Sequence, residues 1–456
     1  MPGLSLILET ARRALMSQQV GINVTSHNIA NASTPGYSRQ RVSLTTTPAI
    51  HQTYGYLGTG VQAESVGRLR DAYLDQQIRS SNGTMGSASA QQGVLSQVEA
   101  SFNEPSDAGL SSVMSQFFNS WQDLATHPED SSSRNSVIQQ GVLVSQSFQR
   151  LHSELTQIRD SLTDDVKVKI SSINQLTSEI SDLNNRIVTA AAAGGDPSDL
   201  QDQRDQKIED LSSLANIAVS IDSGGSANVS IGGMTVASRG GSIEISAEQV
   251  GSQLQIFTTK DHVQVNLTGG ELGGDLKLYN TTISGYLAKL DELAGAFIDH
   301  INTLHRAGYG LGTPPSTGVD FFSGTGAADI GVNAAVVSNP SLVAASQDGT
   351  PGDNSVALAI ANATSDKVLT GNTLTLSQFY NGLASSVGSD INAVDSTANS
   401  QQLILAQLEN QRQSVSGVSL DEEMTNLIQY QRAYDAAARL VNTANQMFQT
   451  VLDMVA

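Results

Sequence analysis

The sequence predicts a mainly α protein with one small inserted β domain, arranged as an elongated rod of several domains. Three observations carry this prediction. Apolar residues recur every three or four positions between residues 134 and 193, both ends of the chain have an amphipathic helical pattern, and the period changes to two from residue 217 to about residue 272. A helix over the first of these segments would be roughly 85 Å long at about 1.5 Å per residue, more than a compact globule needs.

The N-terminal helix is predicted over residues 3–31. Its apolar face is formed by Leu4, Leu8, Leu15, Ile22 and Ile29. A dense cluster of helix-breaking residues follows. Pro35 pushes Thr34 out of the α region, and Pro35-Gly36 suits the centre of a type II turn. Residues 37–67 then alternate as short strands joined by turns.

The turn accounts for proline and glycine but leaves other residues of this stretch without a reason. Tyrosine and arginine are favoured anchors at protein interfaces, and asparagine bonds to backbone in turns. We therefore predict an assembly interface here. Its residues are Asn28, Asn31, Pro35, Gly36, Tyr37 and Arg39.

The middle of the chain alternates between the two periods. Helical patterns cover most of residues 68–215 and 275–413, and residues 307–350 are mostly loop. Between the two helical parts, Gly232-Gly233 separates two short alternating runs, which is a hairpin signal.

The C-terminal segment mirrors the N-terminal one. Its apolar seam contains Met424, Leu427, Tyr434, Val441 and Phe448. Because an amphipathic helix is stabilised mainly by packing its apolar face, the two ends are expected to pair like a coiled coil. The predicted domains are the paired ends with their strands (1–67 and 414–456), a discontinuous helical rod (68–215 and 275–413), and an outer β domain (216–274).

Composition excludes several functional classes. The chain has 24 basic and 44 acidic residues, a net charge of -20, which disfavours nucleic acid and anionic membranes as partners. It has no cysteine, which excludes disulfides and thiolate metal sites. Glu9, Arg12 and Arg13 interrupt the N-terminal apolar run, so a cleavable signal peptide is not expected. No apolar run reaches the roughly 18 residues that span a bilayer.

Chemistry-bearing motifs are missing from the sequence. None of the seven histidines lies in H-E-x-x-H, and there is no P-loop, G-x-S-x-G or G-x-G-x-x-G. No pair of carboxylates is singled out as a glycosidase pair. We therefore expect no catalytic, cofactor-binding or metal-binding residues, no cofactor, and no enzymatic activity.

Four segments carry a resemblance to a known group. "SHNIANASTPGYSRQ" (26–40) resembles the motif of the flagellar rod, hook and hook-associated axial proteins, and "RLRDAYLDQQIR" (68–79) is similar to the segment that follows it there. "SVSGVSLDEEMTNLIQYQRAYDAAARLVNTANQMF" (414–448) and "DLQDQRDQKIEDLSSL" (199–214) are similar to the hook-associated protein 1 family. The matching segments extend from one end of the chain to the other.

The resemblance implies a structural role in the bacterial flagellum and in motility. It implies export by the flagellar type III system, an extracellular location, and a homo-oligomeric helical ring that acts as an adaptor at the hook–filament junction. The implied partners are the hook protein, the second junction protein (hook-associated protein 3), and a cytosolic export chaperone that binds the C-terminal helix. Neither nucleic acid nor membrane insertion is implied.

Other functions remain open at this point. The nearest is another axial protein, of the hook-associated protein 3 type or of the hook and rod type; flagellins lack this form of the motif. A secreted cell-wall hydrolase would need a catalytic domain with paired acids. A coiled-coil adhesin would not need the Thr34-Pro35-Gly36-Tyr37 motif.

Overall fold

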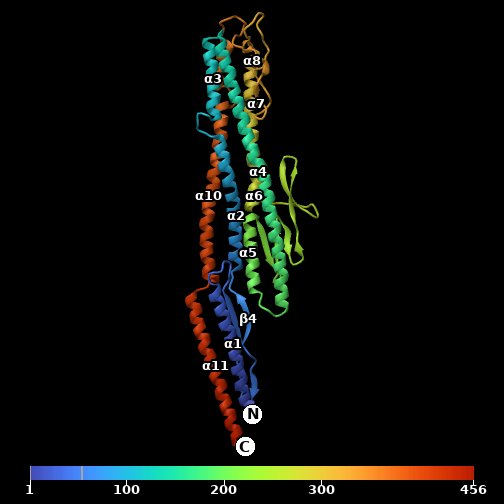
Figure 1. Cartoon of the computed structure of the whole chain (residues 1–456), viewed down its shortest axis with the longest axis vertical. Helices are drawn as coiled ribbons and strands as arrows, with labels where there is room; N and C mark the ends of the chain where they lie inside the picture. Colours follow the sequence, from blue (N-terminus) through green and yellow to red (C-terminus); the bar gives the residue numbers. More distant parts are fainter. Residues whose placement is uncertain (1, 53–54, 456) are drawn as a thin grey trace. The chain divides into compact units, whose positions relative to one another are not determined.

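The computed structural model describes residues 2–52 and 55–455 of the chain, and it is mainly α, as predicted (Figure 1). Residues 1, 53, 54 and 456, which fall within the predicted terminal domain bounds, lie outside the described residues. The chain forms two compact units. Unit 1 contains residues 1–83, 172–244 and 401–456, and unit 2 contains residues 84–171 and 245–400. Helices α2 (Ala72–Phe102), α4 (Ser131–Ala192) and α10 (Leu376–Ser416) contribute to both units.

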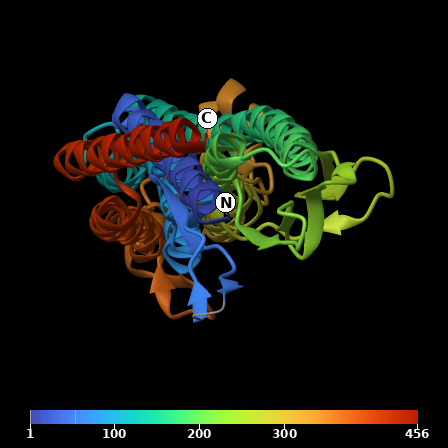
Figure 2. The same ribbon diagram turned by 90° about the horizontal axis from the view of Figure 1, so that it is seen from below.

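In unit 1 the two ends of the chain pair, as the sequence predicts. Helix α1 (Pro2–Asn31) lies beside α11 (Leu420–Val455), and Figures 1 and 2 both show them next to each other. The buried line of α1 is made of small and polar residues rather than leucines. Its members are Ala11, Ser17, Gly21, Thr25 and Asn28. Such small side chains allow close approach, and the ring of Tyr430 lies directly over Gly21.

Short strands follow α1 in unit 1. Strand β1 (Gln40–Thr46) pairs antiparallel with β4 (Val61–Arg68), and β2 (Ile50–Gln52) pairs with β3 (Gly55–Leu57). The β1–β4 ribbon packs along α1, where the Ser17 hydroxyl donates to the Val61 carbonyl at 3.3 Å. Helix α1 is therefore held between a helix and a ribbon.

Helix α5 (Ser198–Leu214) and a four-stranded sheet complete unit 1. The sheet has the order β5 (Ile217–Ile221), β6 (Ala227–Ile231), β7 (Met234–Ser238) and β8 (Gly241–Ser242). The predicted hairpin at Gly232-Gly233 is confirmed: Ile231 pairs with Met234, and both glycines have positive φ (56° and 84°). A tight two-residue turn requires such φ values.

Unit 2 is built around further helices: α3 (Leu110–Thr126), α6 (Gly270–Lys277), a π-helix η1 (Leu278–Thr282), α7 (Ile283–Arg306), α8 (Ala334–Ser338) and α9 (Ser355–Asn362). Its largest sheet has the order β11 (Gln264–Val265), β10 (Gln253–Thr258), β9 (Ile245–Val250). Two-stranded pairs join β12 (Phe322–Ser323) to β13 (Gly331–Val332) and β14 (Lys367–Leu369) to β15 (Leu374–Thr375). The short 3₁₀ turns are η2 (Pro340–Leu342) and η3 (Ala363–Ser365).

The period-two segment forms two separate sheets. Strands β5–β8 belong to unit 1 and β9–β11 to unit 2, so a boundary between the two units falls within residues 216–274. The predicted three-domain division places its boundaries elsewhere, and it stays a prediction.

Five aromatic residues pack together in the core of unit 2. Phe117 and Trp121 of α3 meet Phe297 of α7 and Phe321-Phe322 at β12, with ring centroids 5.2–6.2 Å apart. All five are at most 1% exposed. This core stabilises a chain that has only 5% aromatic residues.

The long apolar seam is confirmed as helix α4, whose 62 residues include the whole predicted pattern but for one residue at its end. Within unit 2, Phe148, Leu155 and Val166 of this seam are fully buried. Within unit 1, Ile180 and Ile187 are fully buried. In the described part of the chain, no helix combines the length and apolar character that crossing a membrane requires.

Candidate assembly site

The predicted interface motif forms the turn between α1 and β1 in unit 1. Helix α1 ends at Asn31, and the Thr34 amide donates to the Asn31 carbonyl at 2.9 Å. The Tyr37 amide then donates to the Thr34 carbonyl at 3.2 Å, with Gly36 at φ 77°, as expected for a type II turn. A side chain at Gly36 would also collide with Gln206 of α5, because its Cβ would lie 2.7 Å from Oε1.

Asn28 is the centre of a buried hydrogen-bond network. Its side chain donates to the Gln40 carbonyl at 2.9 Å and to Glu423 at 3.0 Å. It accepts from the Gln40 amide at 2.9 Å and from the Tyr37 hydroxyl at 2.7 Å. All four hydrogen-bonding positions of the amide are thereby used. Asn28 is 1% exposed, so its contacts are made within one chain.

Arg39 joins this network to the start of α11. Its guanidinium pairs with Glu423 at 2.7 Å and with Glu422 at 2.8 Å. The Arg39 amide donates to the Ser416 carbonyl at the end of α10, and the Leu69 amide donates to the Arg39 carbonyl. Because Glu423 is only 2% exposed, the ion pair with Arg39 neutralises a buried carboxylate.

Tyr37 is half-buried. Burial raises the pKa of its phenol well above the ordinary value, and the carboxylates of Asp199, Asp202 and Glu423 add to the rise. The hydroxyl therefore keeps its proton and donates to Asn28. The Tyr37 ring packs edge-on against His27 with centroids 5.5 Å apart.

A row of carboxylates on α5 anchors the strands to the helix. Asp202 accepts from the Ser38 amide at 3.0 Å, from its hydroxyl at 2.7 Å and from Arg68 at 2.6 Å. Asp205 accepts from Arg68 at 3.0 Å and from Arg70 at 2.9 Å. Although burial acts to raise the pKa of Asp205, the surrounding guanidinium groups hold it below its ordinary value.

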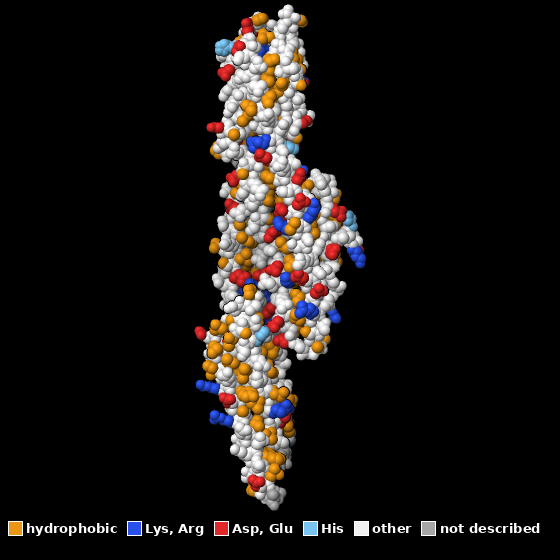
Figure 3. All heavy atoms as spheres, viewed as in Figure 1, with side chains coloured by type: hydrophobic (Ala, Val, Ile, Leu, Met, Phe, Trp, Pro, Cys, Tyr) orange, Lys and Arg blue, Asp and Glu red, His pale blue; other side chains and the backbone are white. Residues whose placement is uncertain are grey.

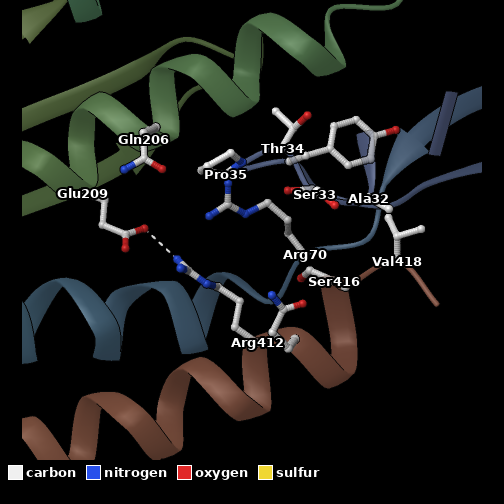
Figure 4. Close-up of a pocket in the computed structure, with 15 residues that line it drawn as sticks. Ala32, Ser33, Thr34, Pro35, Arg70, Gln206, Glu209, Arg412, Ser416 and Val418 are labelled. Carbon is white, nitrogen blue, oxygen red and sulfur yellow. Dashed lines mark hydrogen bonds and ion pairs between the residues drawn. The ribbon is translucent and has the colours of Figure 1, made fainter. Parts of the chain in front are cut away.

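A pocket of about 270 Å³ opens between this turn, α5 and the end of α10 (Figure 4). It is lined by residues 32–38 of the turn together with Arg70, Gln206 and Glu209. Figure 4 shows Arg412 reaching from α10 to Glu209, with which it pairs at 2.6 Å. The motif thus faces a polar pocket whose charges are paired within the chain.

The predicted seam residues occupy two environments. On α1, Leu4, Leu8, Leu15, Ile22 and Ile29 are all half-buried beside the small-residue line. On α11, Leu427, Tyr434 and Val441 are half-buried, whereas Met424 and Phe448 are 48% and 44% exposed. Among the described side chains of α11, the buried apolar positions are instead Ala437 and Ala444.

A large apolar surface thus remains uncovered on the paired helices. Figure 3 shows hydrophobic side chains gathered over α1 and α11. The exposed large ones are Ile7, Met16, Leu420, Met424, Ile428, Leu440, Met447, Phe448, Leu452 and Met454. Within the described residues, no group of His, Asp and Glu side chains is arranged to hold a metal ion.

The network includes residues that the sequence reasoning missed. Glu423, Asp202 and Asp205 are central to it, as are Arg68 and Arg70. The sequence does contain one signal for the two aspartates of α5. Carboxylates recur at three- and four-residue steps along α5, at Asp199, Asp202, Asp205 and Glu209, which puts them on one helix face.

Comparison with known proteins assigns the chain to a family. Residues 95–322 match the model of the flagellar hook-associated protein FlgK helical domain. The ends match broader models: residues 8–37 the flagella basal body rod protein, and residues 409–454 the flagellar basal body rod FlgEFG protein C-terminal model. Flagellar hook-associated protein 1 of Bacillus subtilis is 34% identical over 98% of this chain and 97% of its own length.

The chain belongs to the flagellar hook-associated protein 1 family. Members from Salmonella typhimurium and Escherichia coli are 25% and 23% identical, each over 99% of this chain and 100% of the relative. The flagellar hook junction protein FlgK from Burkholderia pseudomallei has the same fold, with a TM-score of 0.64 and 16% identity over 75% of this chain and 100% of that chain.

Family membership fixes the general role. Flagellar hook-associated protein 1 is a structural protein of the flagellum, and this chain has that structural role at the hook–filament junction. Its location is the flagellum, and it associates with hook and filament components. The two ends of the chain that match the basal body rod models contain the motif network and the exposed apolar surface.

Proposed function

We propose that this protein is a non-enzymatic adaptor whose copies form a helical ring between hook and filament. The observation that carries the proposal is the apolar surface of α1 and α11, which stays exposed in a single copy. An exposed apolar patch of this kind marks a contact surface. In a ring, neighbouring copies would cover it, and each end of the ring would meet a different partner.

The motif residues Asn28, Asn31, Pro35, Gly36, Tyr37 and Arg39 would set how the chain leaves α1. In this proposal they act mainly within the subunit, because the Asn28 network ties α1, β1 and α11 together. A fixed exit lets every copy present α1 and α11 in the same way. The three-domain division, with the paired ends innermost and residues 216–274 outermost, belongs to this proposal.

The partners follow from the same surface. We propose that the hook protein and the second junction protein, hook-associated protein 3, contact the ring from its two sides. We propose export by the flagellar type III route to an extracellular position, with a cytosolic chaperone covering the apolar face of α11 beforehand. Exposed α11 residues such as Met424, Phe448 and Leu452 give such a chaperone an apolar target.

Deletion of the gene tests the proposal. Hook and filament subunits have different surfaces, so flagellin should find nothing to add to. We expect cells with bare hooks, no swimming, and monomeric flagellin in the medium, seen by electron microscopy and immunoblotting. A plasmid copy of the gene should restore filaments. Full-length filaments on the hooks of the deletion strain would contradict the adaptor function.

A further inference from the structure

Four asparagines on helices make the same pair of hydrogen bonds to the backbone of a strand. In each, the amide nitrogen donates to the carbonyl of one residue, and the amide oxygen accepts from the N–H of that same residue. The pairs are Asn28 with Gln40 (2.9 and 2.9 Å), Asn184 with Ala227 (2.8 and 2.8 Å), Asn280 with Leu254 (2.9 and 2.7 Å), and Asn302 with Phe322 (2.9 and 2.8 Å).

The four strand positions have much in common. Gln40, Ala227 and Phe322 are the first residues of β1, β6 and β12, and Leu254 is the second residue of β10. Each pairs with one neighbouring strand residue in its sheet: Arg68, Ile221, Val332 and Gln249, respectively. The asparagine therefore takes the side of the backbone that a further strand would otherwise take.

These hydrogen bonds satisfy buried backbone groups and also fix the register of a short strand. The N–H and C=O of one strand residue point to the same side, and leaving both unpaired in a buried place is costly. Short strands also specify their register weakly, and a slip by one residue reverses every side chain. Strand β12 has two residues and β6 has five. A side chain that binds one backbone residue at both groups fixes the position of the strand along the helix.

We propose that Asn28, Asn184, Asn280 and Asn302 are positioning residues that attach the β elements to the helices of their own unit. Asn28, Asn184 and Asn302 are at most 6% exposed, and Asn280 lies in the π-helix η1 and is half-buried. Asn28 and Asn184 hold the strands of unit 1, whereas Asn280 and Asn302 hold those of unit 2. The proposal concerns the isolated subunit and does not depend on the adaptor function.

The surroundings of each asparagine predict a rank order for substitution by aspartate. Aspartate keeps the shape and the acceptor but loses the donor and places a charge against a carbonyl. At Asn184, the Arg204 guanidinium lies 3.5 Å from the amide oxygen and would pair with the new carboxylate. At Asn28, the Glu423 carboxylate lies 3.0 Å from the amide nitrogen and would repel it. The effect should therefore be smaller for N184D than for N28D.

Hydrogen–deuterium exchange of the purified full chain tests this. For N280D and N302D we expect at least tenfold faster exchange, confined to the strand that each asparagine binds. The acceleration in the bound strand should be larger for N28D than for N184D. The matched control is N185D, because Asn185 is exposed and bonds only within its own helix, to the Ser181 carbonyl. Exchange unchanged from the control, or raised equally in all strands of the unit, would overturn the proposal.

A measurement without any variant covers the case in which a substitution prevents folding. In the wild-type protein, the amides of Ala227, Leu254 and Phe322 should be protected as strongly as amides inside the sheets. Exchange at the rate of free edge amides would overturn the proposal independently of the variants.

Discussion

Glu423→Ala offers a direct test of the network that joins α1, β1 and α11. Glu423 accepts from Asn28 at 3.0 Å and pairs with Arg39 at 2.7 Å, and its side chain is 2% exposed. The adjacent Glu422 pairs with the same arginine at 2.8 Å but is 62% exposed. Glu422→Ala is therefore the control, because it removes a carboxylate that pairs with the same arginine at nearly the same distance but is exposed, whereas Glu423 is buried and also accepts from Asn28.

The expected magnitudes differ because burial differs. Removing one partner of a buried ion pair costs about 3–5 kcal/mol. Arg39 is 21% exposed and keeps Glu422, which reduces this to about 2–4 kcal/mol for Glu423→Ala. The exposed pair should contribute no more than about 0.5 kcal/mol.

Amide exchange in the first turns of α11 measures this difference locally. At about 1.4 kcal/mol per factor of ten, Glu423→Ala should accelerate exchange roughly 30- to 700-fold, and Glu422→Ala about twofold. The aromatic core of unit 2 should exchange as in the wild type. Equal effects of the two substitutions would refute the reasoning, because burial would then not decide the strength of the pair.

Three further outcomes are expected. Burial lowers the pKa of His305 from 6.5 to about 4. The stability that the neutral side chain contributes is therefore fully present above pH 6.5, and the free energy of unfolding falls by about 3 kcal/mol as the pH is lowered to 4. Urea unfolding at pH 6.5 and pH 4 should show this decrease, and His305→Gln should reduce the difference between the two pH values. Gly21→Ala should weaken the α1–α11 pair, since its Cβ would lie 2.8 Å from the Tyr430 ring. Gly93→Ala has open space around it and should stabilise α2 by about 1 kcal/mol. Thermal melts in which both substitutions stabilise the protein would exclude the close contact at Gly21. Limited proteolysis of dilute protein should trim roughly 30–70 residues from each end and leave the rest resistant, and cuts concentrated in 134–193 would contradict paired ends that need neighbours.

The sequence predicts the helices well because their signals are local. The three- and four-residue steps of α4 continue for many turns, and the breakers after Asn31 mark the end of α1. The pairing of α1 with α11 could also be inferred, since two amphipathic ends need a partner. The small-residue line through Gly21 was not predicted, because apolar periodicity points to leucines and does not show how closely two helices approach.

The motif was recognised from the sequence but its hydrogen-bond network was not, and its role at an assembly interface stays a prediction. Asn28, Tyr37 and Arg39 were expected at an interface, yet Asn28 bonds within the chain to residues 12 and 395 positions away. No local pattern encodes a partner at that separation. The same limit applies to Asn184 and Asn302, whose hydrogen bonds to strand backbones depend on how the chain returns to the helix. The carboxylate row of α5 was readable, but its arginine partners were not.

The central claim is that α1 and α11 form the surface covered on assembly, and accessibility of single cysteines tests it most directly. The chain has no cysteine, so Phe448→Cys and the control Val250→Cys each introduce a single thiol, at positions that are 44% and 48% exposed. Both should react with a maleimide in the purified protein. In flagella isolated from motile cells, the account predicts that Phe448→Cys is protected while Val250→Cys, on the proposed outer β segment, still reacts. Equal labelling of Phe448→Cys in the free and assembled protein would contradict the account.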